Sequence, residues 1–199
     1  LKKQLNINMR VLGLSNSRKM LVDENGIDLQ NWSTLLDAGE PATLDGFLDH
    51  VVELNQRNSI FVDITANADV ADMYGKYLKQ SVAVVACNKI AAASDFKNYS
   101  ELKRLSKAYN APLLFETNVG AGLPIIDTLN NLIASGDRVN RIQAVLSGSL
   151  NFVFNNFKSG DSFHDVVQAA KAEGFTEPDP RIDLSGVDVA RKILILARE

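Results

Sequence analysis

The chain has 199 residues, 21 of them lysine or arginine and 24 aspartate or glutamate, with a formal net charge of −3 at neutral pH. This length allows one sizeable domain or two small ones. The scattered basic residues argue against a nucleic-acid partner, and no apolar run is long enough to cross a bilayer. Cys87 is the only cysteine, so an intrachain disulfide is impossible and a reducing cytoplasm is the expected location.

Short apolar runs alternate with segments of helical periodicity through the first two thirds of the chain. The apolar runs predict strands at 9–14, 60–65, 82–86, 113–115 and 142–146. The helical patterns lie at 44–55, 68–80, 95–109 and 124–135. Because parallel strands need crossovers that helices supply, this alternation predicts an α/β fold with a largely parallel sheet.

Helical patterns then follow one another without intervening strands. They lie at 149–158, 162–173 and 185–199. The change in pattern places a predicted domain boundary near 116–124, without a flexible spacer. The chain is therefore expected to contain two domains, at 1–115 and 116–199.

Polar residues follow the predicted strands, at the edge where open α/β sheets bind ligands. Lys89 could hold a phosphate or donate to a carbonyl oxygen, although a solvated surface lysine is the simpler explanation. Thr65 could contact a cofactor, and capping of the next helix by Asn67 explains that segment equally well. Ser15 and Arg18 follow the predicted strand at 9–14, at the place of the second strand of a dinucleotide fold. Small polar residues with an arginine at that place favour a 2′-phosphate and therefore NADP.

The segment 118–124, with the sequence NVGAGLP, combines two glycines with a proline at the start of a helix. Such a loop could bind an anion through its N–H groups or a cation through its carbonyls. An ordinary strand-to-helix turn is the simpler interpretation of the spacing alone.

The most charged stretch is 177–192, with the sequence EPDPRIDLSGVDVARK. Asp188 and Lys192 are spaced i, i+4 and therefore share one face of the last predicted helix. Asp188 could form a capping box with Ser185, and Lys192 a surface ion pair with Asp188. They could instead line a polar pocket in which Lys192 holds an ammonium near a reacting oxygen and Glu177 meets a substrate ammonium. The residues alone leave both interpretations open.

Three segments together resemble homoserine dehydrogenases, and most of all the homoserine dehydrogenase part of the bifunctional aspartokinase–homoserine dehydrogenases. The segments are NVGAGLP at 118–124, LSGSLNF at 146–152 and GFTEPDPRIDLSGVDVARK at 174–192. The resemblance spans essentially the whole chain, and the third motif is highly specific. It implies an incomplete Rossmann-like dinucleotide-binding domain at 1–115, because neither the first strand nor a GxGxxG loop is present. It implies the start of an α+β substrate domain at 116–199.

The resemblance also implies an activity and a set of site residues. The reaction is the NAD(P)-dependent interconversion of L-aspartate 4-semialdehyde and L-homoserine, on the route to threonine, methionine and isoleucine. Lys192 matches the proton donor to the aldehyde oxygen, Lys89 a lysine beside the nicotinamide and substrate, and Thr65 a cofactor contact. The matched substrate-binding residues are Glu177, Asp183 and Asp188. Backbone carbonyls match a monovalent cation site, expected to bind sodium, at Glu116, Val119, Ala121 and Leu123.

The missing loop and strand lead us to expect a fragment of a longer homo-oligomeric enzyme, with weak cofactor binding or none. Two other hypotheses stay open. As isolated, the chain could be a non-catalytic fragment that self-associates through its exposed apolar surface. It could also be an oxidoreductase that acts on another aldehyde or hydroxy acid. The motif at 174–192 argues against this hypothesis.

Overall fold

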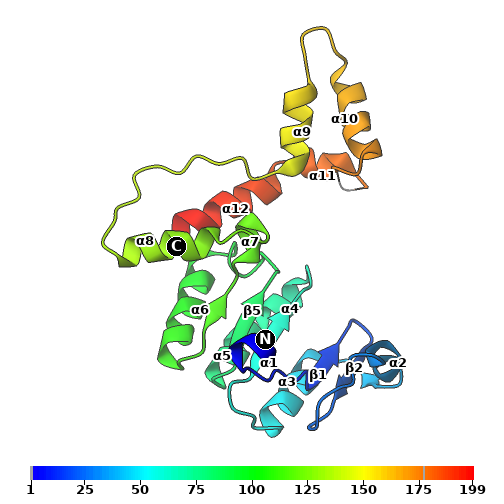
Figure 1. Cartoon of the computed structure of the whole chain (residues 1–199), viewed down its shortest axis with the longest axis vertical. Helices are drawn as coiled ribbons and strands as arrows, with labels where there is room; N and C mark the ends of the chain where they lie inside the picture. The colour runs from blue at the N-terminus through cyan, green and yellow to red at the C-terminus, as the bar shows by residue number, and fades with distance from the viewer. Residues whose placement is uncertain (1, 177) are drawn as a thin grey trace.

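A three-stranded parallel sheet forms the centre of the first half of the chain (Figure 1). In the computed structural model, which describes residues 2–176 and 178–199, β5 (Ala83–Ala86) lies between β4 (Ile60–Asp63) and β6 (Leu113–Leu114). Asp63 pairs with Ala86, so β4 and β5 end at the same edge of the sheet. The predicted α/β fold is confirmed.

Helices that precede or connect these strands pack in the same core as part of the sheet. They are α3 (Leu44–Glu53), α4 (Ala68–Asp72), α5 (Tyr74–Lys79) and α6 (Phe96–Ala108). Tyr74, Leu78 and Val84 are almost completely buried between helix and sheet. The Tyr77 ring stacks on Phe61, with ring centroids 4.1 Å apart. The helix predicted at 68–80 is therefore present, divided at its middle into α4 and α5.

The strand predicted at 9–14 does not join the parallel sheet, and that expectation was wrong. Residues here form β1 (Gly13–Ser15), which pairs antiparallel with β2 (Lys19–Val22), and β2 pairs with β3 (Glu40–Pro41). The cause is a tight turn in which the Asn16 carboxamide oxygen accepts hydrogen bonds from the backbone N–H groups of Arg18 and Lys19. This turn favours pairing with the adjacent segment. Two short helices accompany this part, α1 (Lys2–Leu5) and α2 (Trp32–Asp37).

The second half of the chain is helical. Its elements are α7 (Thr117–Gly120), α8 (Ile125–Ala134), α9 (Gly148–Asn156), α10 (Phe163–Ala172), α11 (Pro180–Leu184) and α12 (Val187–Arg198). Figure 1 shows α9 and α10 as a hairpin that projects away from the sheet, while α12 runs back to α7 and α8. Within the described ranges, no helix has the length and apolar character needed to span a membrane.

The strand predicted at 142–146 is absent, so this expectation was also wrong. The segment is an irregular connection, and Val145 is 77% exposed. A strand needs a neighbouring edge to satisfy its backbone groups, and none of the described strands pairs with this segment.

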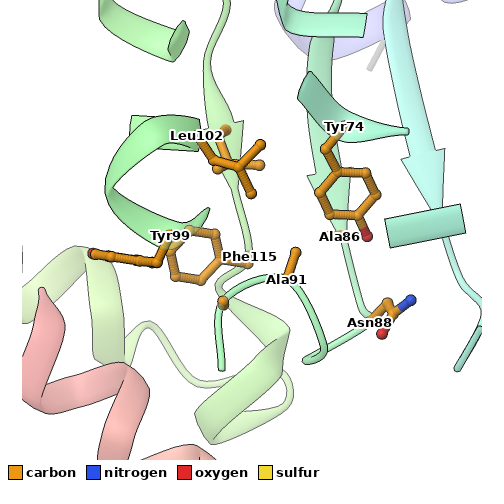
Figure 2. Close-up of a pocket in the computed structure, with 9 residues that line it drawn as sticks. Tyr74, Ala86, Asn88, Ala91, Tyr99, Leu102 and Phe115 are labelled. Atoms are coloured by element: carbon orange, nitrogen blue, oxygen red, sulfur yellow. The ribbon is translucent and has the colours of Figure 1, made fainter. Parts of the chain in front are cut away.

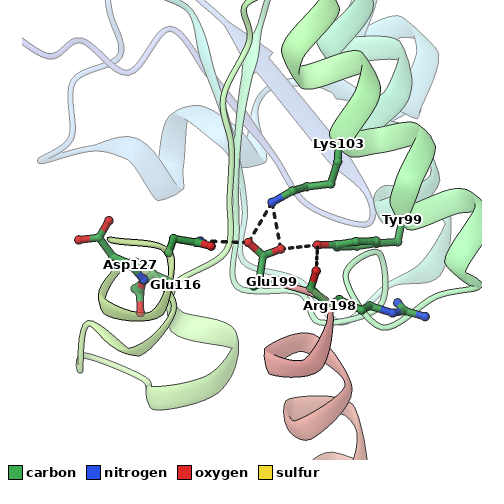
Figure 3. Close-up of polar contacts among 7 residues, drawn as sticks. Tyr99, Lys103, Glu116, Asp127, Arg198 and Glu199 are labelled. Carbon is green, nitrogen blue, oxygen red and sulfur yellow. Dashed lines mark hydrogen bonds and ion pairs between the residues drawn. The ribbon is translucent and has the colours of Figure 1, made fainter. Parts of the chain in front are cut away.

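A buried polar cluster fixes the C-terminal end of α12 against the first half of the chain (Figure 3). We call it the Glu199 cluster, and its members are Tyr99, Lys103, Asn130 and Glu199. The Glu199 side chain is only 2% exposed. Its carboxylate accepts hydrogen bonds from the Tyr99 hydroxyl at 2.5 Å, from Lys103 Nζ at 2.9 and 3.0 Å, and from Asn130 at 3.1 Å. This cluster connects α12 to both α6 and α8.

Candidate functional site

Two lysines from different halves of the chain meet at one carboxylate. Lys192 Nζ lies 2.6 Å from Asp188 Oδ2, and Lys89 Nζ lies 3.4 Å from Asp188 Oδ1. Lys192 Nζ also donates to the Leu146 carbonyl at 2.7 Å. We call Lys89, Asp188 and Lys192 the two-lysine site. The Lys192 side chain is only 16% exposed, so a fully solvated surface ion pair does not describe it.

The electrostatics of the site hold Asp188 in its charged form. Partial burial acts to raise the pKa of the Asp188 carboxyl. The hydrogen bond from Lys192 and the positive charges of Lys89 and Lys192 outweigh burial, so the pKa lies below its ordinary value. A single negative charge therefore balances two ammonium groups that would otherwise repel each other.

A buried polar network at the ends of β4 and β5 positions Lys89. The Asp63 side chain is almost fully buried and accepts hydrogen bonds from the Tyr74 hydroxyl at 2.6 Å and from Asn88 Nδ2 at 3.1 Å. Asn88 Nδ2 also donates to the Asn67 carbonyl at 2.9 Å, which fixes the residue that directly precedes Lys89. Burial and the bond to Asp63 raise the pKa of Tyr74 above its ordinary range, so the hydroxyl stays protonated and remains a donor.

The same network lines a small pocket between the sheet and α6. Figure 2 shows Tyr74 and Asn88 on one side of this pocket and the Tyr99 and Phe115 rings on the other. Its walls are mostly apolar and include Asn88 and Ala91, which flank Lys89 closely in the sequence. Packing of this kind restricts the backbone that carries Lys89.

Asp183 connects α11 to α9. The Ser149 hydroxyl donates a hydrogen bond to Asp183 Oδ1 at 2.7 Å, and Asp183 is partly buried. Glu177 lies outside the described residues. Substrate roles for Asp183 and Glu177 therefore stay predictions.

The predicted cofactor residues are divided between two sheets. Thr65 follows β4, where its amide donates to Asp63 Oδ1 at 2.7 Å and its hydroxyl accepts from the Asn67 amide at 3.2 Å. Asn67 caps α4 through its side chain, as expected for a helix start. Ser15 and Arg18 lie instead at the turn between β1 and β2, in the separate antiparallel sheet. Within the described chain, no side chain pairs with the exposed Arg18 guanidinium.

The predicted cation-binding carbonyls lie around the short helix α7. The Glu116 carbonyl accepts a bond from the Val119 amide at 3.5 Å, and the Leu123 carbonyl accepts from the Ile125 amide at 2.9 Å. Ala121 has a φ of +52°, which reverses the chain at this point. These carbonyls are hard, neutral oxygen donors of the type that suits a sodium ion. Two of them take part in the local turn while each retains a second lone pair.

Sequence reasoning missed the network around Asp63 and the Glu199 cluster. A signal for the first was available, because Asp63 is a charged residue within the apolar strand sequence IFVDIT. A buried charge in a strand needs partners, and this requirement predicts a polar network. Nothing in the sequence pattern pairs Glu199 with residues about 100 positions earlier.

Comparison with known proteins places the whole chain in one family. The model of the homoserine dehydrogenase NAD-binding domain matches residues 1–116, and the homoserine dehydrogenase model matches residues 124–199. The chain is 46% identical over its full length to a bifunctional aspartokinase/homoserine dehydrogenase 1 of Zea mays, of which it covers 22%. It is 41% identical over 88% of its length to the homoserine dehydrogenase of Schizosaccharomyces pombe, of which it covers 48%.

Comparison with solved structures also finds homoserine dehydrogenases. The structure superimposes on a hyperthermophilic archaeal homoserine dehydrogenase in complex with NADPH with a TM-score of 0.77 at 27% identity, over 94% of this chain and 58% of that one. The chain thus spans about a fifth of the length of its bifunctional relatives. The resemblance inferred from the motifs is confirmed, and the chain belongs to the homoserine dehydrogenase family.

Proposed function

We propose that this chain carries the hydride-transfer site of an NAD(P)-dependent homoserine dehydrogenase, which interconverts L-aspartate 4-semialdehyde and L-homoserine. The observation that carries the proposal is the meeting of Lys89, from the nucleotide-binding half, with Lys192 at the Asp188 carboxylate. Two lysines at one carboxylate are not explained by a solvated helix surface. They suit a reaction that places negative charge on an oxygen, because two ammonium groups stabilise that charge.

Lys192 acts as the proton donor to the aldehyde oxygen. An ammonium group has three N–H donors, and Lys192 directs one to Asp188 and one to the Leu146 carbonyl. The third donor is left for the substrate oxygen. A bound nicotinamide nucleotide supplies the hydride in the reducing direction. As charge develops on the oxygen, Lys192 neutralises it by hydrogen bonding and proton transfer, and Lys89 adds a second positive charge.

Acidic residues hold the amino-acid end of the substrate. The substrate carries an α-ammonium group, which requires a carboxylate partner in a partly desolvated pocket. We assign this role to Glu177 and Asp183, with Asp188 orienting both lysines. An apolar cleft beside the two-lysine site, between the segment 145–151 and Val189 on α12, offers a wall for the short aliphatic part of the substrate.

Thr65 and Lys89 face the nicotinamide end of the cofactor, and Ser15 and Arg18 face the adenosine end. The exposed Arg18 guanidinium favours the 2′-phosphate of NADP there. Sodium binds the carbonyls of the loop that carries α7. We further propose a homo-oligomer in the cytoplasm that binds neither nucleic acid nor membranes. The single cysteine supports a reducing compartment.

Titration of the chain with NADPH and with NADH, followed by fluorescence, tests the cofactor part of the proposal. Saturable NADPH binding with a dissociation constant below about 1 mM supports it, and NADPH should bind more tightly than NADH. Absence of binding to both at this concentration contradicts a cofactor site in this chain. If sedimentation then shows self-association, the alternative of a non-catalytic, self-associating fragment is the better account.

A further inference from the structure

One arginine contacts both elements that bring the two lysines together. Arg198 is on α12, the helix that also carries Asp188 and Lys192. Its guanidinium donates from Nη1 to the Ala92 carbonyl and from Nη2 to the Ser94 carbonyl, both at 2.7 Å. These carbonyls belong to the turn at 89–94, which begins with Lys89. Arg198 is thus bonded to the segment that presents the opposite lysine.

The geometry of this contact resists sliding and rotation. Two hydrogen bonds from one planar guanidinium to two different carbonyls restrict both the distance and the orientation of the turn relative to the helix. The guanidinium also lies over the Tyr99 ring, 5.1 Å from its centroid. The turn itself is closed by the bond from the Ala93 amide to the Lys89 carbonyl at 2.9 Å. Displacing Ala92 and Ser94 would therefore displace Lys89.

The distance along the helix makes this connection effective. Lys192 and Arg198 are six residues apart, about 9 Å along the α12 axis. At one end of this stretch Arg198 holds the turn, and at the other Asp188 and Lys192 meet Lys89. Without Arg198, the ion pair between Lys89 and Asp188 would have to align two partly exposed side chains by itself, and exposed ion pairs contribute little.

We infer that Arg198 is a positioning residue that sets the turn at 89–94 against α12, so that Lys89 reaches Asp188. The inference rests on the proposed function only for its catalytic meaning. It assigns no substrate or cofactor contact to Arg198. The inference predicts that removing the Arg198 guanidinium separates Lys89 from Asp188, while the pair of Asp188 and Lys192 within α12 is retained.

Carbodiimide cross-linking of the 199-residue chain tests this directly, because the reagent joins an amine and a carboxylate in contact. Peptide mass spectrometry then gives the ratio of the Lys89–Asp188 product to the Lys192–Asp188 product. The second product forms within one helix and serves as an internal reference. In Arg198→Ala the ratio should fall by about tenfold, the change expected when a charged hydrogen bond no longer holds one arrangement.

Arg191→Ala is the matched control, since Arg191 is an exposed arginine on the same helix, and the ratio should not change. If circular dichroism shows that Arg198→Ala does not fold, Arg198→Lys replaces it in the test. Lysine keeps the positive charge but lacks the planar guanidinium, so the cross-link ratio should also fall in this variant. A wild-type ratio in the folded Arg198→Ala or Arg198→Lys variant overturns the inference. The readout needs no turnover, so it is independent of whether the proposed dehydrogenase activity is found.

Discussion

Replacing Lys103 by methionine should weaken the attachment of α12, because it removes the only cation that contacts the Glu199 carboxylate within the described part of the chain. Methionine keeps most of the apolar stem of lysine and removes the charge. Glu199 would remain buried with the Tyr99 hydroxyl and the Asn130 amide as partners. Removal of one partner of a fully buried ion pair costs about 3–5 kcal/mol.

The expected loss is smaller here because Lys103 is itself 36% exposed and two neutral donors stay in place. We therefore expect the free energy of unfolding to fall by about 2 kcal/mol, within the range for hydrogen bonds to charged groups. Urea unfolding followed by circular dichroism measures it. The control Lys107→Met removes an exposed lysine from the same helix and should change stability by less than about 0.5 kcal/mol.

A double variant distinguishes loss of the ion pair from loss of packing. In Lys103→Met/Glu199→Gln the buried group is neutral and needs no cation, so part of the lost stability should return. If Lys103→Met is as stable as the Lys107→Met control, the Glu199 cluster does not hold α12, and the reasoning is refuted.

Three further outcomes are expected. Burial acts to raise the pKa of Glu199, but the hydrogen bonds to its carboxylate hold the pKa below the ordinary value. The contribution of Glu199 to stability is therefore complete above the unfolded pKa of about 4.3 and is lost as pH falls through the folded pKa. Urea unfolding at stepped pH should give a shallower acid slope for Glu199→Gln. Gly120→Ala should cost about 1–3 kcal/mol because its Cβ would overlap Ile125, whereas Gly122→Ala has open space and should be nearly neutral. In an active enzyme, Glu177→Gln should raise the KM for homoserine; an effect confined to the cofactor KM would contradict its role.

Much of the fold could be predicted from local patterns. Parallel β4, β5 and β6 were evident as apolar runs between helical segments, and their bounds differ from the prediction by one or two residues. The wrong sheet predicted for the strand at 9–14 and the absent strand at 142–146 share a cause. Strand formation depends on which edge is available for pairing, and periodicity contains no information about the partner.

The site was predictable in part, for a similar reason. The pairing of Asp188 with Lys192 follows from helical spacing and is confirmed at 2.6 Å. The approach of Lys89 to Asp188, separated by 99 positions, depends on how α12 docks, and this docking is set by Arg198 and the Glu199 cluster. Side chains that act by joining distant segments have no spacing signal in the sequence. The motif resemblance predicted a role for Lys89, and the structure gives the position of Lys89 relative to Asp188.

The most direct test of the two-lysine site is the kcat for homoserine oxidation after Lys192→Ala. The measurement uses the Zea mays bifunctional enzyme with its matching region replaced by this chain, since the two are 46% identical over that region. In oxidation the group that donates the proton during reduction must accept it, so its loss predicts a decrease in kcat of about 100-fold or more with folding intact. Arg191→Ala on the same helix should retain the wild-type kcat. An unchanged kcat in a folded, NADP-binding Lys192→Ala variant would contradict the assignment of Lys192 as the proton donor.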